Sequence, residues 1–203
     1  PTRPRPLTKM DLRGRTVRGN FFHAPIQGEL DSLVDALITI DDTGIIAAVH
    51  RPGDADYYTA LAAAGDQLVT LPADHYALPG FVDLHVHAPQ YPQLGLALDE
   101  PLEVWLQKYT FPLEARYADL DFARPRYTAL VEDLLANGTT TALYFATQHR
   151  EATELLADIC IAKGQRALVG KVVMDDPAAC PPDYRDASSE SAVADTRAII
   201  DYI

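Results

Sequence analysis

The sequence predicts an α/β fold in which a small β-rich unit precedes the first part of a (β/α)8 barrel. Short strands and turns fill residues 16–78, whereas strands alternate with helices from residue 79 onward. That alternation implies parallel strand pairing with right-handed crossovers. A complete barrel of this type has about 250 residues, and residues 79–203 supply about half of them. We therefore expect a truncated chain that holds only the first strands of the barrel.

The segment before the barrel is expected to form a leader and a small β-sandwich-like unit. Residues 1–15 are rich in arginine and lead into no apolar signal-peptide core, so we expect a flexible leader. Residues 16–78 alternate strand-forming residues with turn residues, which is typical of a small β-rich domain. Its expected elements are a strand at 16–23, strands at 36–40 and 45–49 joined by a turn, a short helix from Tyr57 to Gly65, and a strand at 67–71.

The barrel segment, residues 79–203, contains three predicted strands separated by helices. Apolar residues at helical spacing and the stop signal Asn137-Gly138 indicate a helix at 120–136, with Pro125 in its first turn. The last helix places Val193, Ile199 and Ile200 on one face and has no cap at its end, so we expect it to continue. The predicted strands cover 81–87, 139–146 and 166–174, and the other helices cover 102–109, 153–163 and 189 onward.

Composition argues against several classes of function. A net charge of −12 disfavours binding to nucleic acid, because a polyanion would be repelled. The sequence contains no run of 18 or more apolar residues, so we expect no membrane span. Cys160 and Cys180 are too few for a disulfide framework and form no Cys-x-x-Cys motif. We therefore expect reduced thiols and a cytoplasmic protein.

The most informative motif is a pair of histidines at the end of the predicted strand at 81–87. Side chains alternate along a strand, so Asp83, His85 and His87 share one face. Imidazole is the commonest metal ligand in proteins and suits zinc, nickel and iron(II). Two imidazoles on one strand can hold a single ion, which would support metal-assisted hydrolysis. Taken alone, a chance His-x-His on a solvated strand explains the pair equally well.

Other candidate residues have both functional and structural interpretations. Asp83 could orient a histidine or bind neighbouring backbone, and His149 could line the pocket or lie in a surface loop. Trp105 and Tyr109 could stack on a ligand or pack in the core. Lys171 could bridge two metal ions, but its position within a strand favours a site with one metal. The weaker ligand candidates, which precede the barrel, are His23, His50 and His75.

Several short segments carry a more specific pattern than the histidine pair. They are FVDLHVH at 81–87, APQY at 88–91, EVWLQKYTFP at 103–112, NGTTT at 137–141, YFAT at 144–147 and VGKVVMD at 169–175. The first of these resembles the first-strand signature of the amidohydrolase superfamily. Together, the segments resemble the guanine deaminase family within that superfamily. The resemblance covers nearly the whole chain, from Arg18 onward.

The resemblance implies a zinc-dependent hydrolase of purine catabolism that converts guanine to xanthine and ammonia. It implies that His85 and His87 bind one zinc ion per active site. The residues that would contact guanine are His87, Ala88, Pro89 and Gln90. It also implies a homodimeric full-length enzyme with a small-molecule substrate and no nucleic-acid or membrane partner.

The resemblance leaves the catalytic residues unassigned. In the family, a third zinc-binding histidine, a glutamate that transfers protons and a zinc-binding aspartate come from later strands, beyond Ile203 of this sequence. Two alternatives therefore stay open beside guanine deamination. One is a related amidohydrolase that acts on another amino-heterocycle, such as a triazine or cytosine. The other is an inactive fragment with only partial metal binding.

Overall fold

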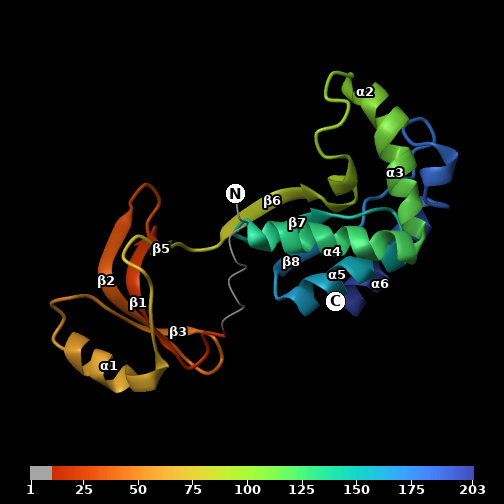
Figure 1. Ribbon diagram of the computed structural model, residues 1–203. Helices are drawn as coiled ribbons and strands as arrows, with labels where there is room; N and C mark the ends of the chain where they lie inside the picture. Colours follow the sequence, from red (N-terminus) through yellow and green to blue (C-terminus); the bar gives the residue numbers. More distant parts are fainter. Residues whose placement is uncertain (1–10) are drawn as a thin grey trace. The chain divides into compact units, whose positions relative to one another are not determined.

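The computed structural model describes residues 11–203, and the chain separates into two units, Pro1–Pro79 and Gly80–Ile203 (Figure 1). Most of the predicted leader, residues 1–10, lies outside the described residues. The end of the leader is hydrogen-bonded to the first unit: Gly14 N donates to Asp41 O at 3.0 Å, and Arg15 O accepts from Ile40 N at 2.8 Å. No helix of the described chain combines the length and the apolar character that crossing a membrane requires.

The first unit is built on one five-stranded sheet. The sheet order is β3-β2-β1-β4, and β5 also pairs with β1. Strands β1 and β2 are antiparallel, as are β2 and β3, which confirms the predicted hairpin. The described residues of this unit form a single sheet, so the β-sandwich-like arrangement stays a prediction. The strands are β1 (Thr16–His23), β2 (Asp31–Ile40), β3 (Ile46–His50), β4 (Leu68–Thr70) and β5 (Tyr76–Ala77).

Strand β2 starts five residues earlier than the predicted strand at 36–40, and an irregularity explains the difference. Asp35 has a φ of 52°, which interrupts the alternation of side chains. Its carboxylate accepts a hydrogen bond from Arg18 Nε at 2.7 Å, and its amide donates to Asn20 Oδ1 at 3.1 Å. These contacts fix the bend between the two strands, where their register shifts.

Apolar side chains of the first sheet gather on one face and the helix α1 (Tyr57–Ala64) packs near β2. The buried cluster contains Val17, Phe21, Leu33 and Ala36. A cavity of about 700 Å³ with a mainly apolar lining adjoins it. Helix α1 confirms the predicted helix and is anchored by Tyr57, whose hydroxyl donates to Asp35 O at 2.8 Å.

The second unit contains three parallel strands in the order β6-β7-β8, which confirms the predicted parallel pairing. The strands are β6 (Phe81–His87), β7 (Thr139–Phe145) and β8 (Arg166–Gly170). Helix α4 (Leu120–Ala136) connects β6 to β7, and helix α5 (Arg150–Lys163) connects β7 to β8. This is the arrangement of the opening strands and helices of a barrel.

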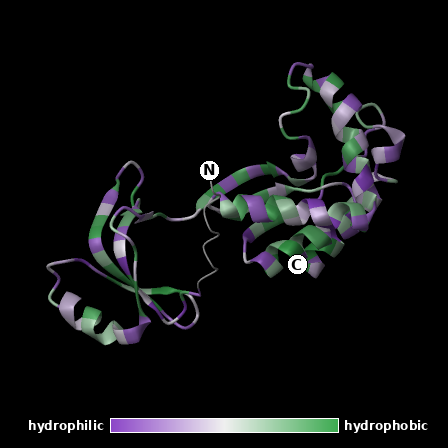
Figure 2. Ribbon diagram, in the orientation of Figure 1, coloured by the Kyte–Doolittle hydropathy of each residue, from purple (hydrophilic) through white to green (hydrophobic). Residues whose placement is uncertain are grey.

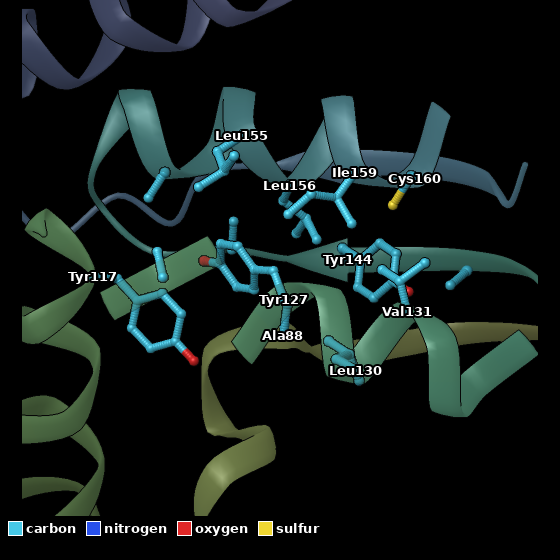
Figure 3. Packing of buried hydrophobic residues seen from close by; sticks show 14 of the residues in the cluster. Ala88, Tyr117, Tyr127, Leu130, Val131, Tyr144, Leu155, Leu156, Ile159 and Cys160 are labelled. Atoms are coloured by element: carbon cyan, nitrogen blue, oxygen red, sulfur yellow. The ribbon is translucent and has the colours of Figure 1, made fainter. Parts of the chain in front are cut away.

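Helices α4 and α5 pack their apolar sides against the sheet. Figure 2 shows hydrophobic and hydrophilic residues interspersed along both helices, as expected where one side is buried. In Figure 3, Leu130 and Val131 of α4 and Leu156 of α5 lie around Tyr144 of β7. Tyr144 is 1% exposed, and its hydroxyl donates to Gln165 Oε1 at 2.6 Å. The core thereby buries a large ring without leaving its polar atom unsatisfied.

Helix α4 has the predicted boundaries, but the prediction that Pro125 lies in its first turn is wrong. The Asp119 side chain caps the helix by accepting from Asp121 N at 2.9 Å, so the helix begins well before the proline. Pro125 therefore sits inside the helix, where it removes one backbone donor. Close to it, Arg126 Nη1 donates to Phe122 O at 2.9 Å.

Several other boundaries differ from prediction. Helix α5 starts at Arg150, three residues before the predicted start, and β8 ends at Gly170, four residues before the predicted end. The predicted helix at 102–109 is helix α2 (Leu102–Trp105) followed by a π-helical turn, η3 (Leu106–Thr110). The remaining elements of the unit are η2 (Ala88–Gln93), α3 (Phe111–Ala115), η4 (Arg116–Ala118), η5 (Pro182–Tyr184) and α6 (Ser189–Tyr202).

Helix α6 buries only part of its predicted apolar face. Ala192 and Ile199 are buried, but Val193 is 48% exposed and Ile200 is 70% exposed. The helix starts with a capping box, in which the Ser188 hydroxyl accepts from Ser191 N at 3.2 Å.

Gly80 lies where β6 begins and has no room for a side chain. A Cβ atom at this position would be 2.0 Å from Thr140 Oγ1 and 2.7 Å from Thr140 Cβ. The next residue pairs with the start of β7, because Phe81 N donates to Gly138 O at 2.8 Å. The close approach of β6 to β7 therefore requires glycine at position 80.

We expect Leu156→Ala to lower the free energy of unfolding by about 3 kcal/mol, because Leu156 is fully buried and its truncation leaves a cavity. Urea denaturation followed by circular dichroism measures the change. Ile161→Ala is the matched control on the same helix: Ile161 is 73% exposed, so the change should stay within about 0.5 kcal/mol. Equal losses in the two variants would contradict the packing of α5.

Candidate functional site

Strand β6 brings His85 and His87 together at its carboxyl end. Their Nε2 atoms lie 3.1 Å apart, and their ring centroids are 5.1 Å apart. The two side chains therefore share one face, as the alternation along the strand predicts. In parallel barrels the carboxyl ends of the strands carry the active site.

Asp83 supports the strand rather than an imidazole. The pairing between β6 and β7 shifts register between Asp83 and Val86, which leaves a bulge before the histidine pair. Asp83 Oδ1 accepts a hydrogen bond from His85 N at 3.0 Å, so the carboxylate satisfies a backbone amide within the bulge. Of the two roles considered for Asp83, the structure supports the hydrogen bond to the neighbouring backbone.

The distance between the two imidazole nitrogens suits a shared metal ion. Two nitrogen ligands at about 2.0 Å from a tetrahedral zinc ion would be about 3.3 Å apart, close to the 3.1 Å between these Nε2 atoms. Among residues 11–203, no group of three or more histidine, cysteine or acidic side chains is arranged to hold a metal. A zinc site needs at least three protein ligands, so the histidine pair alone would be an incomplete site.

The histidine pair packs against an aromatic ring, and His87 is partly buried. Phe145, at the end of β7, stacks on His87 with ring centroids 4.9 Å apart and lies 5.0 Å from the ring of His85. Burial, followed by the neighbouring His85, lowers the pKa of His87 below the ordinary histidine value. A lowered pKa favours the neutral imidazole, which is the form that binds metals.

A groove of about 600 Å³ runs beside the histidines at the edge of β6. Its lining combines polar groups of β6 and η2 with apolar groups of helix α4, including Leu130 and Leu134. Of the four residues predicted to contact a substrate, His87 and Gln90 line this groove. Ala88 and Pro89 are fully buried and do not line this groove, so their contact with a substrate stays a prediction.

Gln90 is held by a buried carboxylate that the sequence analysis did not identify. Gln90 Nε2 donates to Glu114 Oε1 at 3.0 Å, and the Tyr184 hydroxyl donates to Glu114 Oε2 at 2.6 Å. Burial raises the pKa of Glu114, and the two hydrogen bonds offset part of that effect. In the sequence, Glu114 looks like an ordinary solvated helix residue. Only contacts across distant segments reveal its role.

Lys171 forms a structural ion pair. Its Nζ lies 2.8 Å from Asp186 Oδ1, and the two side chains are 0% and 5% exposed. The other Asp186 oxygen accepts from Met174 N at 2.7 Å, which ties the chain after β8 to the residues before α6. Lys171 is thereby engaged in an ion pair, and the expectation of a single metal ion stays a prediction.

The remaining candidate residues lie outside strand β6. His149 precedes helix α5, and burial lowers its pKa. Trp105 Nε1 donates to Leu96 O at 3.3 Å, and the ring is partly exposed rather than packed in the core. The other histidines, His23, His50 and His75, belong to the first unit.

We expect the stability of the protein to depend on Glu114 in the acidic range. Because its folded pKa is raised above the ordinary value of 4.5, the native state keeps its proton where the unfolded chain has lost it. Stability therefore falls as pH rises from about 4.5 to the folded pKa, by at most about 1.4 kcal/mol per pH unit. Denaturation of the wild type and Glu114→Gln across this range measures the effect, since the neutral variant lacks this slope. A constant difference between the two proteins would contradict the burial of a titrating carboxyl group.

We expect Lys171→Met to destabilise the fold by about 3–5 kcal/mol, because it leaves the Asp186 carboxylate buried without its cation. Chemical denaturation measures the loss. Adding Asp186→Asn to Lys171→Met should recover part of it, since the buried charge is then gone. A single variant as stable as the wild type would show that the ion pair is not buried in solution.

Comparisons with known proteins find relatives that match most of this chain. The chain is 37% identical over 195 residues to a guanine deaminase of Dictyostelium discoideum, covering 92% of the chain and 43% of that protein. It is 40% identical over 175 residues to human guanine deaminase, covering 86% of the chain and 38% of that protein. The chain therefore spans about two fifths of the length of the curated relatives it matches.

The fold has a counterpart of known structure, and a family model covers most of the chain. A guanine deaminase from C. acetobutylicum, solved with bound guanine in its active site, superposes with a TM-score of 0.79 at 34% identity. That superposition covers 92% of this chain and 42% of the solved one. Residues 76–203, which include the histidine pair, match the model of the amidohydrolase family. The chain belongs to the amidohydrolase family.

Proposed function

We propose that this chain is the amino-terminal part of a guanine deaminase, which hydrolyses guanine to xanthine and ammonia in purine catabolism. The observation that carries the proposal is the pair of imidazole nitrogens 3.1 Å apart at the carboxyl end of a parallel strand. The reaction class follows from that donor pair. The choice of guanine rests on relatives and a solved structure that are named guanine deaminases.

In this proposal, His85 and His87 hold one zinc ion per active site through their Nε2 atoms. When bound, zinc supplies Lewis acidity that makes water nucleophilic near neutral pH. Phe145 stacks on His87 and restricts the ring orientation of this ligand. The half-buried setting keeps His87 neutral, so that its nitrogen lone pair is available. The remaining ligands and the groups that transfer protons come from later strands of the barrel.

The substrate lies against the end of β6 and the turn η2. His87 and Gln90 present polar side chains to the groove, and the buried Ala88 and Pro89 support the turn behind them. The primary amide of Gln90 carries a donor and an acceptor, which match adjacent groups on a purine edge. Overall, water replaces the amino group at C2: a C–O bond forms and the C–N bond breaks. One water proton leaves in ammonia, and the other ends on the ring nitrogen N3 of xanthine.

Exposed apolar side chains at the sheet edges support a barrel with further strands. On β6, Phe81, Val82 and Leu84 are 58%, 60% and 65% exposed, and Leu168 of β8 is 58% exposed. Each of these strands pairs with β7 alone among the described strands. Apolar strand edges of this kind are normally covered by another strand or helix. We propose that later strands cover them in the full-length enzyme.

Two further parts of the proposal concern the environment of the enzyme. We propose a cytoplasmic location, which is supported by the free, buried thiols of Cys160 and Cys180. We also propose that the full-length protein is a homodimer, in keeping with the family that it resembles. Its substrate is a small molecule, without nucleic-acid or membrane partners.

The proposal is tested by zinc content and ammonia release in the full-length enzyme. The wild type should hold one zinc ion per chain and release ammonia from guanine, but not from adenine, cytosine or a triazine. His85→Ala should lose both properties, because it removes half of the described donor pair. His75→Ala is the matched control, since His75 lies in the first unit beside Asp74, and it should retain both. Preference for cytosine or a triazine would favour a related amidohydrolase, and unchanged zinc content in His85→Ala would falsify the ligand assignment.

A further inference from the structure

Glu114 is a buried carboxylate whose hydrogen-bond partners are neutral. It lies on helix α3 and is 5% exposed. Its partners are the side-chain amide of Gln90 and the phenol of Tyr184. Burying a carboxylate is costly unless hydrogen bonds compensate for lost hydration, and neutral donors compensate less than a cation does. A carboxylate that is buried despite this loss of hydration, beside a candidate site, indicates a function in that site.

The contact with Glu114 determines which way the Gln90 amide faces. Both carboxylate oxygens accept: Oε1 from Gln90 Nε2 at 3.0 Å, and Oε2 from the Tyr184 hydroxyl at 2.6 Å. A carboxylate offers only acceptors, so the amide group that meets it must be the NH2 group. The Gln90 Oε1 atom therefore points away from Glu114, as does the second N–H.

The carboxylate is itself fixed in place by Tyr184. The ring of Tyr184 is fully buried and packs against Phe111 with centroids 5.8 Å apart. Its hydroxyl, besides donating to Glu114, accepts from Gln148 N at 3.3 Å. Segments from η2, α3, η5 and the loop after β7 thus meet at one buried carboxylate. Glu114 cannot turn without breaking contacts in at least one of these segments.

We propose that Glu114 is a positioning residue that locks the Gln90 amide with its oxygen toward the ligand, so that the site selects a heterocycle presenting an N–H donor there. This inference rests on the proposed function, because it deepens the role given to Gln90. Glu114 acts through Gln90 and contacts no substrate itself. A free amide could turn over and offer either group, whereas a locked amide offers a fixed acceptor.

The locked orientation discriminates between purines. Guanine carries a carbonyl oxygen at C6 beside an N–H at N1, which match a fixed amide donor and acceptor. Adenine carries an amino group and an unprotonated nitrogen at those positions, so its donor and acceptor are reversed. A rotating glutamine would accommodate both arrangements, and a fixed one accommodates a single arrangement.

The kinetic test is a double-mutant cycle in the full-length enzyme, with guanine as substrate. Gln90→Ala and Glu114→Ala should each raise KM for guanine by about tenfold, with a smaller change in kcat. If Glu114 acts through Gln90, removing it from the Gln90→Ala variant should change KM less than about twofold. If the increases in KM of the two single variants multiply in the double variant, the proposal is overturned.

A matched control separates positioning from general loosening of the turn. Thr110→Val removes the acceptor of a second buried amide on η2, because Gln93 Nε2 donates to Thr110 Oγ1 at 2.8 Å. Its effect on KM should be small and should persist unchanged in the Gln90→Ala background. If Thr110→Val loses its effect in that background as Glu114→Ala does, loosening of η2 explains both, and the proposal fails. Should Glu114→Ala not fold, Glu114→Gln replaces it in the cycle, since it offers an acceptor to only one of the two donors.

A measurement on the 203-residue chain is independent of catalysis. In nuclear magnetic resonance spectra, the two Gln90 side-chain amide protons should have separate signals, with the proton bound to Glu114 shifted downfield and slow to exchange. Glu114→Ala should remove that signature, and Thr110→Val should keep it. An unchanged Gln90 amide in Glu114→Ala would overturn the inference. Failure of the full-length wild type to act on guanine, with the signature intact, would instead remove the proposed function.

Discussion

The geometry of β6 is the constraint on which the rest of the second unit depends. Val86 of this strand packs against the core formed by α4 and α5, while the Nε2 atoms of His85 and His87 lie 3.1 Å apart at its carboxyl end. A bulge interrupts its pairing with β7, and Asp83 satisfies the backbone amide that the bulge releases. The arrangement of the histidine pair therefore depends on a local irregularity as much as on regular alternation.

Local signals in the sequence predicted the boundaries of elements that begin or end at capping residues. Helix α4 matches its predicted range because Asp119 caps its start and Asn137 closes its end. The beginning of β2 was missed because Asp35 breaks the side-chain alternation through contacts with Arg18 and Asn20, which are distant in sequence. The end of β8 was overestimated because the apolar residues after Gly170 still resemble a strand in composition, although they lie outside the sheet.

The candidate site was predictable only where one segment contains the whole pattern. His85 and His87 are two residues apart, so alternation alone places them together. Gln90 was predicted as a substrate contact only through a family resemblance. Glu114 and Tyr184 escaped notice because their contact joins residues that are far apart in the chain. Short-range patterns hold no information about such contacts, which arise only when helices pack.

Gly80, the first residue of the second unit, has no room for a side chain, and it precedes the strand that carries the histidine pair. A methyl group there would collide with Thr140 and act as a wedge between neighbouring strands. Such a displacement would alter the start of the strand that carries His85 and His87, whose rings pack against Phe145. Packing against Thr140 therefore restricts the position after Pro79 to glycine, at the start of the strand whose opposite end carries His85 and His87.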